Sequence, residues 1–418
     1  MRARRWIFRL GAVSLGILLP LALLEGYLRL TGAGGGFYEP DPILGARLIP
    51  NSTGRWRKVC FDVPIRISSQ GLRDVEHPVE KPLGTRRVAV LGDSLVEALQ
   101  VPLEQTFPRR LEGILNASGM APKAEVINFG VSGYGTDQMY LSLKTRAAGY
   151  RPDVVVLVFT IGNDVRNNSP ALERQLSSYP KPFFRLDAGG HLVPIPFEVG
   201  VPSAAGVVGR IKGALRHLRL YDLLVGWVRA RPAALSLLGR VGLVHGAPAR
   251  PSPNGQAVAP ANLPDGGSLD FEVYRRELPA EWVEAWRVSE ALIRAVRDEA
   301  ARRTARFVLV SIPSALELAN PQAVVKEFPG YAPEEFDLAA PRRRLRQFAE
   351  IAGIDYVSMF DVFAEDLRAR NGALEDIFLW CDGHFTPRAH QLVARAIADR
   401  LRGRGSTRAR PDEEHRKR

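Results

Sequence analysis

Short apolar runs alternate with segments of helical periodicity in two parts of the chain. The apolar runs, rich in valine, isoleucine and leucine, predict strands at 88–91, 126–129, 153–159, 307–312 and 354–358. Segments whose apolar residues recur every three or four positions predict helices at 95–115, 137–148, 279–305, 341–352 and 387–401. Strands that are apolar throughout are buried on both faces, and strand–helix alternation is typical of a parallel sheet covered by helices. The pattern therefore predicts an α/β domain over residues 85–402.

Residues 165–270 interrupt this alternation and are predicted to be an insertion rich in proline and glycine. Within it, 207–245 carries many arginines between apolar residues. That stretch is either a lid or interfacial helix lying on anionic lipid, or a covering helix with a solvated basic face. Upstream, residues 32–84 combine a glycine-rich tether with short alternating segments, which predict a small antiparallel β-region. The last segment, 403–418, is polar without an apolar period and is predicted to be a disordered basic tail.

Residues 1–31 predict a membrane anchor. Several arginines precede an uncharged run from Leu10 to Leu24, and the helix reaches spanning length if it continues through Leu30. Arginines before the span place the N-terminus in the cytoplasm, so we expect a single-pass type II helix in the inner membrane, with the rest of the chain periplasmic. The alternative is a cleaved signal peptide, but no small-x-small cleavage site closely follows the apolar run.

Composition, net charge and cysteine content exclude several classes of protein. With 418 residues, of which 46% are hydrophobic, the chain has enough apolar residues for a substantial core. The net charge of +12 would suit nucleic-acid binding, but an exported domain would rarely meet nucleic acid, so we expect none as a partner. Two cysteines are too few for a disulfide-built scaffold or a four-cysteine zinc site. In an oxidising compartment Cys60 and Cys381 could pair, which would tie the β-region to the loop before the last helix.

Polar residues stand in sharp turns after three of the predicted strands, at Gly92-Asp93-Ser94, Ser132-Gly133-Tyr134 and Gly162-Asn163-Asp164. A serine at a strand-to-helix corner exposes its hydroxyl, glycines permit the positive φ that turns backbone N–H groups towards a ligand, and a side-chain amide can donate to an oxyanion. A fourth element, Asp382-Gly383-His384, precedes the last helix. Each alone is explained equally well as a turn or a helix cap. Together they fall where ligands bind in open α/β sheets.

The four elements, in this order, resemble the SGNH or GDSL-type hydrolases, whose fold is a flavodoxin-like three-layer α/β/α sandwich. The resemblance covers about residues 85–165 and 300–402. It implies that the serine is the nucleophile, that an aspartate orients a histidine base, and that backbone and amide N–H groups bind the oxyanion. The residues that match are Ser94, Asp382 and His384 for the catalytic set, and Ser94, Gly133 and Asn163 for the oxyanion hole.

One departure from the family pattern concerns the last element. The usual closing motif is Asp-x-x-His, whereas Cys381 stands three residues before His384 here. The Asp-x-His spacing resembles instead the membrane-anchored and polysaccharide-acylating relatives. Tyr134 and Asp164 are candidate substrate-binding residues. Tyr134, Trp380 and Phe385 flank the predicted site, where they either line an acyl or sugar pocket or simply fill the core.

The resemblance implies a serine esterase that forms an acyl-enzyme and acts on an ester-bearing small molecule or on an acylated glycan or lipid. With a sugar hydroxyl in place of water, the same intermediate would make the protein an O-acyltransferase for exported polysaccharide. A third alternative is a catalytically silent glycan-binding protein on the same fold. No cofactor is expected, and no metal, because His384 and His390 lack a neighbouring carboxylate–cysteine cluster.

Overall fold

The computed structural model describes residues 2–31, 36–117, 122–173, 181–197, 218–221, 269–319 and 334–403. At its centre lies a five-stranded sheet in the order β11-β10-β7-β5-β6, with every neighbouring pair parallel. The strands are β5 (Thr85–Leu91), β6 (Lys123–Asn128), β7 (Val154–Thr160), β10 (Arg306–Ile312) and β11 (Tyr356–Ser358). These five correspond to the five predicted strands, so the α/β prediction with a parallel sheet is confirmed.

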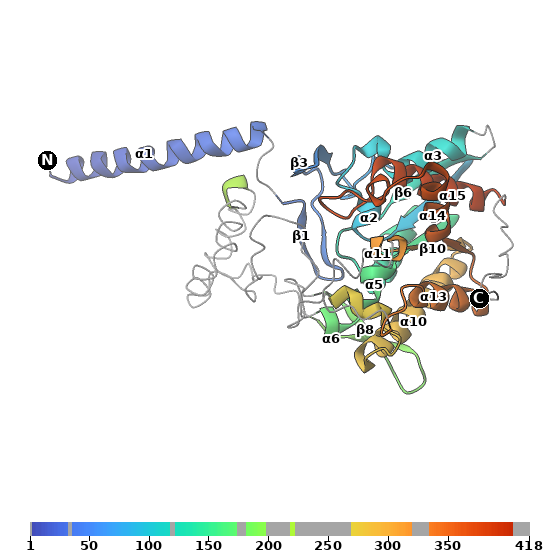
Figure 1. Ribbon diagram of the computed structural model, residues 1–418. Coiled ribbons are helices and arrows are strands. Elements are labelled where there is room, and N and C mark those ends of the chain that lie inside the picture. Colours follow the sequence, from blue (N-terminus) through green and yellow to red (C-terminus); the bar gives the residue numbers. More distant parts are fainter. Residues whose placement is uncertain are drawn as a thin grey trace.

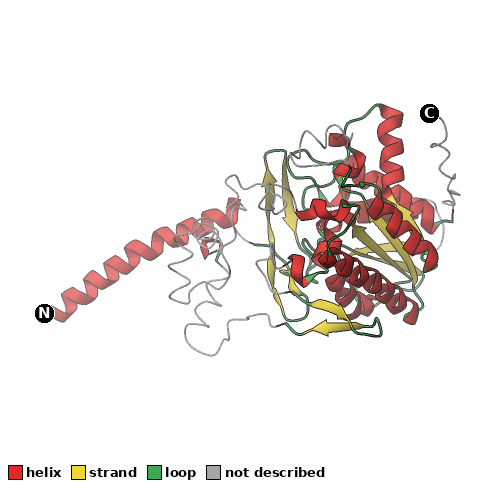
Figure 2. Ribbon diagram, turned by 60° about the horizontal axis from the view of Figure 1, so that its bottom comes forward, coloured by secondary structure: helices red, strands yellow, loops and turns green. Residues whose placement is uncertain are grey.

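Alternate residues of the central strand β7 face opposite layers. Val154, Val156 and Val158 belong to a core that also holds side chains of α3 (Phe107–Ala117), α14 (Met359–Arg370) and α15 (Pro387–Leu401). Val155 and Leu157 belong to the other core, with side chains of α4 (Thr136–Thr145), α10 (Ala280–Arg302) and α13 (Ala340–Ile351). Burial on both faces explains why the strand is apolar throughout. The helices therefore form two layers around the sheet (Figures 1 and 2).

The predicted helix over 95–115 is divided in the structure. It consists of α2 (Ser94–Glu97), the 3-10 helix η1 (Leu103–Gln105) and α3. Ala98 ends α2 with a left-handed backbone (φ 58°), and Pro102 precedes η1. The apolar residues therefore keep their helical spacing across a segment that is not helical. The other four helices lie within a few residues of the predicted ranges.

Two antiparallel hairpins form the predicted β-region. They are β1 (Tyr38–Asp41) with β2 (Gly45–Leu48), and β3 (Thr53–Lys58) with β4 (Phe61–Arg66). Their inward side chains, such as Leu48 and Ile65, share one buried core with residues of the parallel sheet. Tyr134 donates its hydroxyl to the Ala46 carbonyl at 2.7 Å. The hairpins thus pack directly on the loop that follows β6.

Helix α1 (Arg2–Thr31) coincides with the predicted membrane anchor and projects away from the α/β body (Figure 1). Among the residues that the structure describes, no helix combines the length and the apolar character that crossing a membrane requires, so that prediction finds no support here.

The predicted insertion begins inside α5 (Ile161–Asn167) and continues into α6 (Pro170–Glu173). Its described part also contains a hairpin of β8 (Phe183–Leu186) and β9 (Leu192–Ile195). The basic stretch 207–245 lies outside the described residues except for 218–221, as do most of the tether and the C-terminal tail.

Candidate active site

The turn between β5 and α2 presents Ser94 as the first residue of a helix. A side chain at Gly92 would place its Cβ 2.1 Å from Val96 Cγ2, so the tight corner requires glycine. The Asp93 carboxylate caps α2 by accepting from the Leu95 N–H at 3.0 Å. Ser94 is partly exposed, whereas its neighbours on both sides are buried. The local sequence therefore fixes the serine where its hydroxyl can reach a substrate.

The loop before α15 presents His384. The Leu379 N–H donates to the His384 carbonyl at 2.7 Å, and Phe378 and Phe385 form a β-bridge, so the loop closes on itself. Thr386 caps α15 by accepting from the Ala389 N–H at 3.2 Å, and Pro387 occupies the first helical position, as the sequence predicts.

The structure brings Ser94, His384 and Asp382 together. The Ser94 Oγ lies 2.8 Å from His384 Nε2, although 290 residues separate them in the chain. On the other side of the imidazole, Nδ1 lies 2.8 Å from Asp382 Oδ2 and 3.1 Å from the Asp382 carbonyl oxygen. The Asp-x-His spacing therefore places a carboxylate against the ring as the histidine of a catalytic triad requires.

Electrostatics favour the protonation states that such a triad needs. Burial alone would raise the pKa of Asp382, but the hydrogen bond from His384 and the charges of His384 and Lys58 lower it to about 2. Burial lowers the pKa of His384, and the hydrogen bonds and charge of Asp382 more than offset this, so that the pKa lies above its usual value. An ionised carboxylate on Nδ1 keeps the proton there and leaves Nε2 free to accept from Ser94.

The predicted oxyanion residues follow the strands on either side of β5. Gly133, after β6, has a φ of +78°, the left-handed conformation that the glycine pattern predicts. Asn163 lies in α5, directly after β7, and its Nδ2 donates to Asp93 Oδ2 at 3.0 Å. The capping aspartate of the nucleophile turn thus also holds the asparagine amide.

Glu97 is a residue of the site that sequence reasoning missed. It is fully buried at the end of α2 and accepts from the Ser132 backbone N–H and from the Tyr38 hydroxyl, both at 2.9 Å. Burial raises the pKa of this carboxyl to about 7, against the lowering effect of these hydrogen bonds. Glu97 therefore links the nucleophile helix, the loop of Gly133 and strand β1. The sequence shows that Glu97 stands three residues after Ser94. It does not show the contact with Tyr38, which lies 59 residues earlier in the chain.

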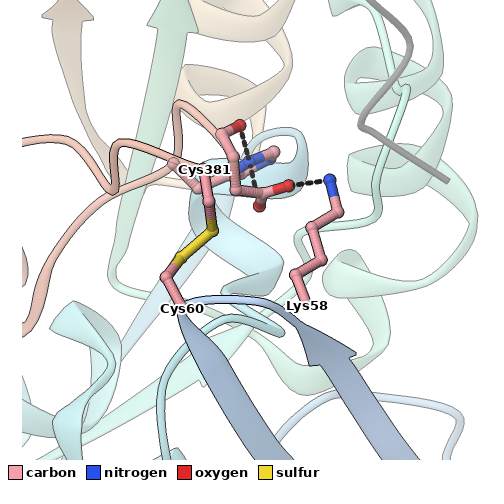
Figure 3. Close-up of a disulfide and its surroundings, with 5 residues drawn as sticks. Lys58, Cys60 and Cys381 are labelled. Carbon is pink, nitrogen blue, oxygen red and sulfur yellow. Dashed lines mark hydrogen bonds and ion pairs between the residues drawn. A yellow bond between two sulfur atoms is a disulfide. The ribbon is translucent and has the colours of Figure 1, made fainter. Parts of the chain in front are cut away.

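Lys58 was also missed. Its Nζ forms an ion pair with Asp382 Oδ1, and the adjoining Cys60 and Cys381 form a disulfide (Figure 3). The predicted pairing of the two cysteines is thereby confirmed, and with it the tie between the β-region and the histidine loop. The cysteines were the one signal in the sequence that β3 lies near the site.

The two candidate substrate-binding residues lie in the interior instead. Tyr134 has no exposed surface, and its hydroxyl donates to the Ala46 carbonyl. Asp164 is also fully buried and accepts from the Thr160 N–H at 2.8 Å, and burial next to the negative charge of Asp93 raises its pKa well above the usual value. Both side chains frame the site and present no surface to a substrate.

The aromatic neighbours of the site divide between core and surface. Phe385 is buried among the rings of α14 and α15, which accords with core filling. Trp380 is 69% exposed beside the histidine loop. His390 is fully buried, where desolvation lowers its pKa to about 3, and its Nδ1 accepts from the Phe107 N–H. Across the described ranges, no group of three or more His, Cys, Asp or Glu residues could hold a metal ion.

At the carboxyl edge of the parallel sheet, the serine is hydrogen-bonded to the histidine, and the aspartate carboxylate forms an ion pair with the other ring nitrogen. This order of groups is the one found in serine hydrolases. Residues 90–392 match the model of the GDSL-like lipase/acylhydrolase family, and the chain belongs to this family. The resemblance to SGNH and GDSL-type hydrolases is thus confirmed. Membership places the protein among hydrolases that act on esters.

The solved structures that match this chain share little sequence with it. An acetylxylan esterase from Geobacillus stearothermophilus is 12% identical, covering 76% of this chain and 95% of its own, with a TM-score of 0.37. A GDSL-like lipase from Bacteroides thetaiotaomicron VPI-5482 is 12% identical over 76% of this chain and 88% of its own, with a TM-score of 0.32. A two-domain esterase active on acetylated mannans is also 12% identical, over 76% of this chain and 49% of its own, with a TM-score of 0.35. Curated proteins gave no match.

Proposed function

We propose that the protein is a serine esterase that forms an acyl-enzyme on Ser94 with His384 as general base and Asp382 as its orienting partner. The observation that carries the proposal is the pair of 2.8 Å contacts on opposite sides of the His384 ring, from Ser94 Oγ to Nε2 and from Nδ1 to Asp382. A buried aspartate on Nδ1 selects the tautomer whose Nε2 accepts a proton.

In the first half-reaction, Ser94 Oγ attacks the ester carbonyl carbon while its proton passes to His384 Nε2. The negative charge then develops on the former carbonyl oxygen, which the backbone N–H groups of Ser94 and Gly133 and the amide of Asn163 are proposed to bind. When the tetrahedral intermediate collapses, the proton moves from His384 to the departing alcohol. Water, deprotonated by the same imidazole, then cleaves the acyl-enzyme and regenerates Ser94.

Transfer to a sugar hydroxyl, the alternative raised by the sequence, uses the same acyl-enzyme. We propose hydrolysis in preference to transfer because the matching family is one of lipases and acylhydrolases. The intact hydrogen bond between Ser94 and His384 supports a catalytic protein over a silent glycan-binding one. The substrate class is an acyl ester, which the family supports in general terms.

We also propose that the domain works in an oxidising compartment outside the cytoplasm. The disulfide between Cys60 and Cys381 supports this location, because such bonds are rare in cytosolic proteins.

Labelling with a fluorophosphonate tests the catalytic proposal. The full-length protein is incubated with the probe, and the adduct is mapped by mass spectrometry, with Ser94→Ala and His384→Ala as controls. The proposal expects an adduct on Ser94 that is lost in the first variant and formed far more slowly in the second. Folded wild-type protein that takes up no label, and hydrolyses no p-nitrophenyl ester, would refute it.

A further inference from the structure

We propose that Lys58 is a positioning residue for the reaction, whose ammonium group holds the Asp382 carboxylate in the orientation that accepts from His384. This inference rests on the proposed function. It gives the N-terminal β-region, which lies outside the residues matched to the family, a part in positioning the catalytic residues.

The Asp382 carboxylate divides its two oxygens between two partners. Oδ1 pairs with Lys58 Nζ, while Oδ2 lies 2.8 Å from His384 Nδ1. Only 2% of the Asp382 side chain and 15% of the Lys58 side chain are exposed, so little water is available to replace the ammonium group. A carboxylate this deeply buried needs such a partner to remain both ionised and fixed.

The loop itself does not fix the carboxylate. The N–H groups of Asp382 and Gly383 donate to the Leu379 carbonyl at 3.0 and 2.7 Å, which holds the backbone but leaves the rotation of the Asp382 side chain to its own partners. His384 Nδ1 is hydrogen-bonded to the Asp382 backbone carbonyl at 3.1 Å and pairs with the carboxylate by charge. Without Lys58, Oδ1 loses its ion-pair partner and the carboxylate can rotate away from the imidazole, and Nδ1 then keeps only the neutral carbonyl. A neutral acceptor stabilises the imidazolium of the transition state less than an anion does.

The hairpin delivers Lys58 to a fixed place. Lys58 ends β3 opposite Phe61, which begins β4. Two residues after Lys58, Cys60 is covalently bound to Cys381, the residue that precedes Asp382 (Figure 3). One covalent and one ionic link, two residues apart on the hairpin, therefore join it to the adjacent residues Cys381 and Asp382.

Arg57, one residue earlier on β3, supplies a matched control. Its guanidinium pairs with Asp62 on the same hairpin at 2.7 Å, and 65% of its side chain is exposed. Because successive residues of a strand point to opposite faces, Arg57 faces away from Lys58. Replacing Arg57 by methionine removes one positive charge from the hairpin, as Lys58→Met does, but leaves the ion pair with Asp382 in place.

The experiment compares full-length wild type with Lys58→Met, Lys58→Arg and Arg57→Met, using p-nitrophenyl acetate as the probe ester. Lys58→Met should lower kcat about 10- to 100-fold with little change in KM, because it disturbs the transition state and not substrate binding. Lys58→Arg should recover most of the rate, and Arg57→Met should match wild type. In an Asp382→Asn background, Lys58→Met should add almost nothing, since its effect acts through that carboxylate.

A second measurement does not depend on turnover. The proton on His384 Nδ1 should give a far-downfield NMR resonance in wild type and in Arg57→Met, and Lys58→Met should shift it upfield or abolish it while the fold is retained. Wild-type kcat and an unchanged resonance in Lys58→Met would overturn the role of Lys58. A downfield resonance that depends on Lys58, in a wild type that neither hydrolyses esters nor takes up fluorophosphonate, would uphold the positioning and refute only the proposed function.

Discussion

The Cys60–Cys381 disulfide closes a loop of 321 residues, and this length sets how strongly it should stabilise the fold. In the chain-entropy description, a cross-link lowers the entropy of the unfolded chain by an amount that grows with the logarithm of the loop length. For this loop the relation gives about 19 cal/mol/K, or about 6 kcal/mol at 25 °C. Measured disulfides usually contribute less than this relation gives. We therefore expect the variant Cys60→Ala/Cys381→Ala to lose between about 2 and 6 kcal/mol of unfolding free energy.

Urea denaturation of wild type and the double variant, each with and without a thiol reductant, measures this difference. Reductant should bring wild type to the stability of the variant and should leave the variant unchanged, which provides an internal control. Mass spectrometry of oxidised wild type should find no free thiol. A difference in unfolding free energy below about 0.5 kcal/mol, with the bond shown to be present, would refute the reasoning from loop closure.

Three further outcomes follow from the site. Asp382→Asn should lower kcat/KM by about 10³- to 10⁴-fold, because the amide favours the wrong tautomer of His384, and steady-state kinetics on p-nitrophenyl acetate would detect this; activity close to wild type would contradict the triad. The kcat/KM of wild type should fall as pH decreases through the raised pKa of His384, since only the neutral ring accepts a proton, so half the activity should be lost at a pH above 6.5; a midpoint below 6.5 in the pH–rate profile would contradict this. The pKa of Glu97 is raised from 4.5 to about 7 in the folded state, so between these pH values the folded protein binds more protons than the unfolded chain, and its unfolding free energy should decrease as the pH rises. In urea titrations, Glu97→Gln should flatten this pH dependence. An unchanged pH dependence would assign it to other groups.

The sheet was predictable from sequence because its strands are buried on both faces. A strand such as β7, Val154–Thr160, offers no polar alternative, and the run of apolar residues marks it directly. The break after α2 was not predictable, because apolar residues continue at helical spacing across Ala98 and Pro102 while the backbone leaves the helix. Local periodicity reports which face is buried, and it does not report whether one helix or several present that face.

The site divides in a similar way. Ser94, Gly133, Asn163 and His384 are marked by turns that stand directly after strands or before a helix, so the sequence carries their positions. Lys58 carries no such mark, since it is one of several basic residues in a short alternating segment and finds Asp382 only through long-range packing. Tyr134 was marked by its place in a functional turn, yet burial against Ala46 gives it a structural role.

On the proposed mechanism, the disulfide and the Lys58 contact also set when the protein becomes active during its synthesis. At about 5–20 residues per second, a ribosome makes Cys381 roughly 16–64 s after Cys60. The hairpin, the turn of Ser94 and the strands of the sheet are made in succession during that interval, and all of them precede the histidine loop. Late in the interval the nascent chain therefore carries Ser94 without His384, its proposed base. Both ends of the domain must be present and joined before catalysis can begin. A chain that lacks either the Lys58 hairpin or the histidine loop should therefore be impaired even where the turn of Ser94 is intact.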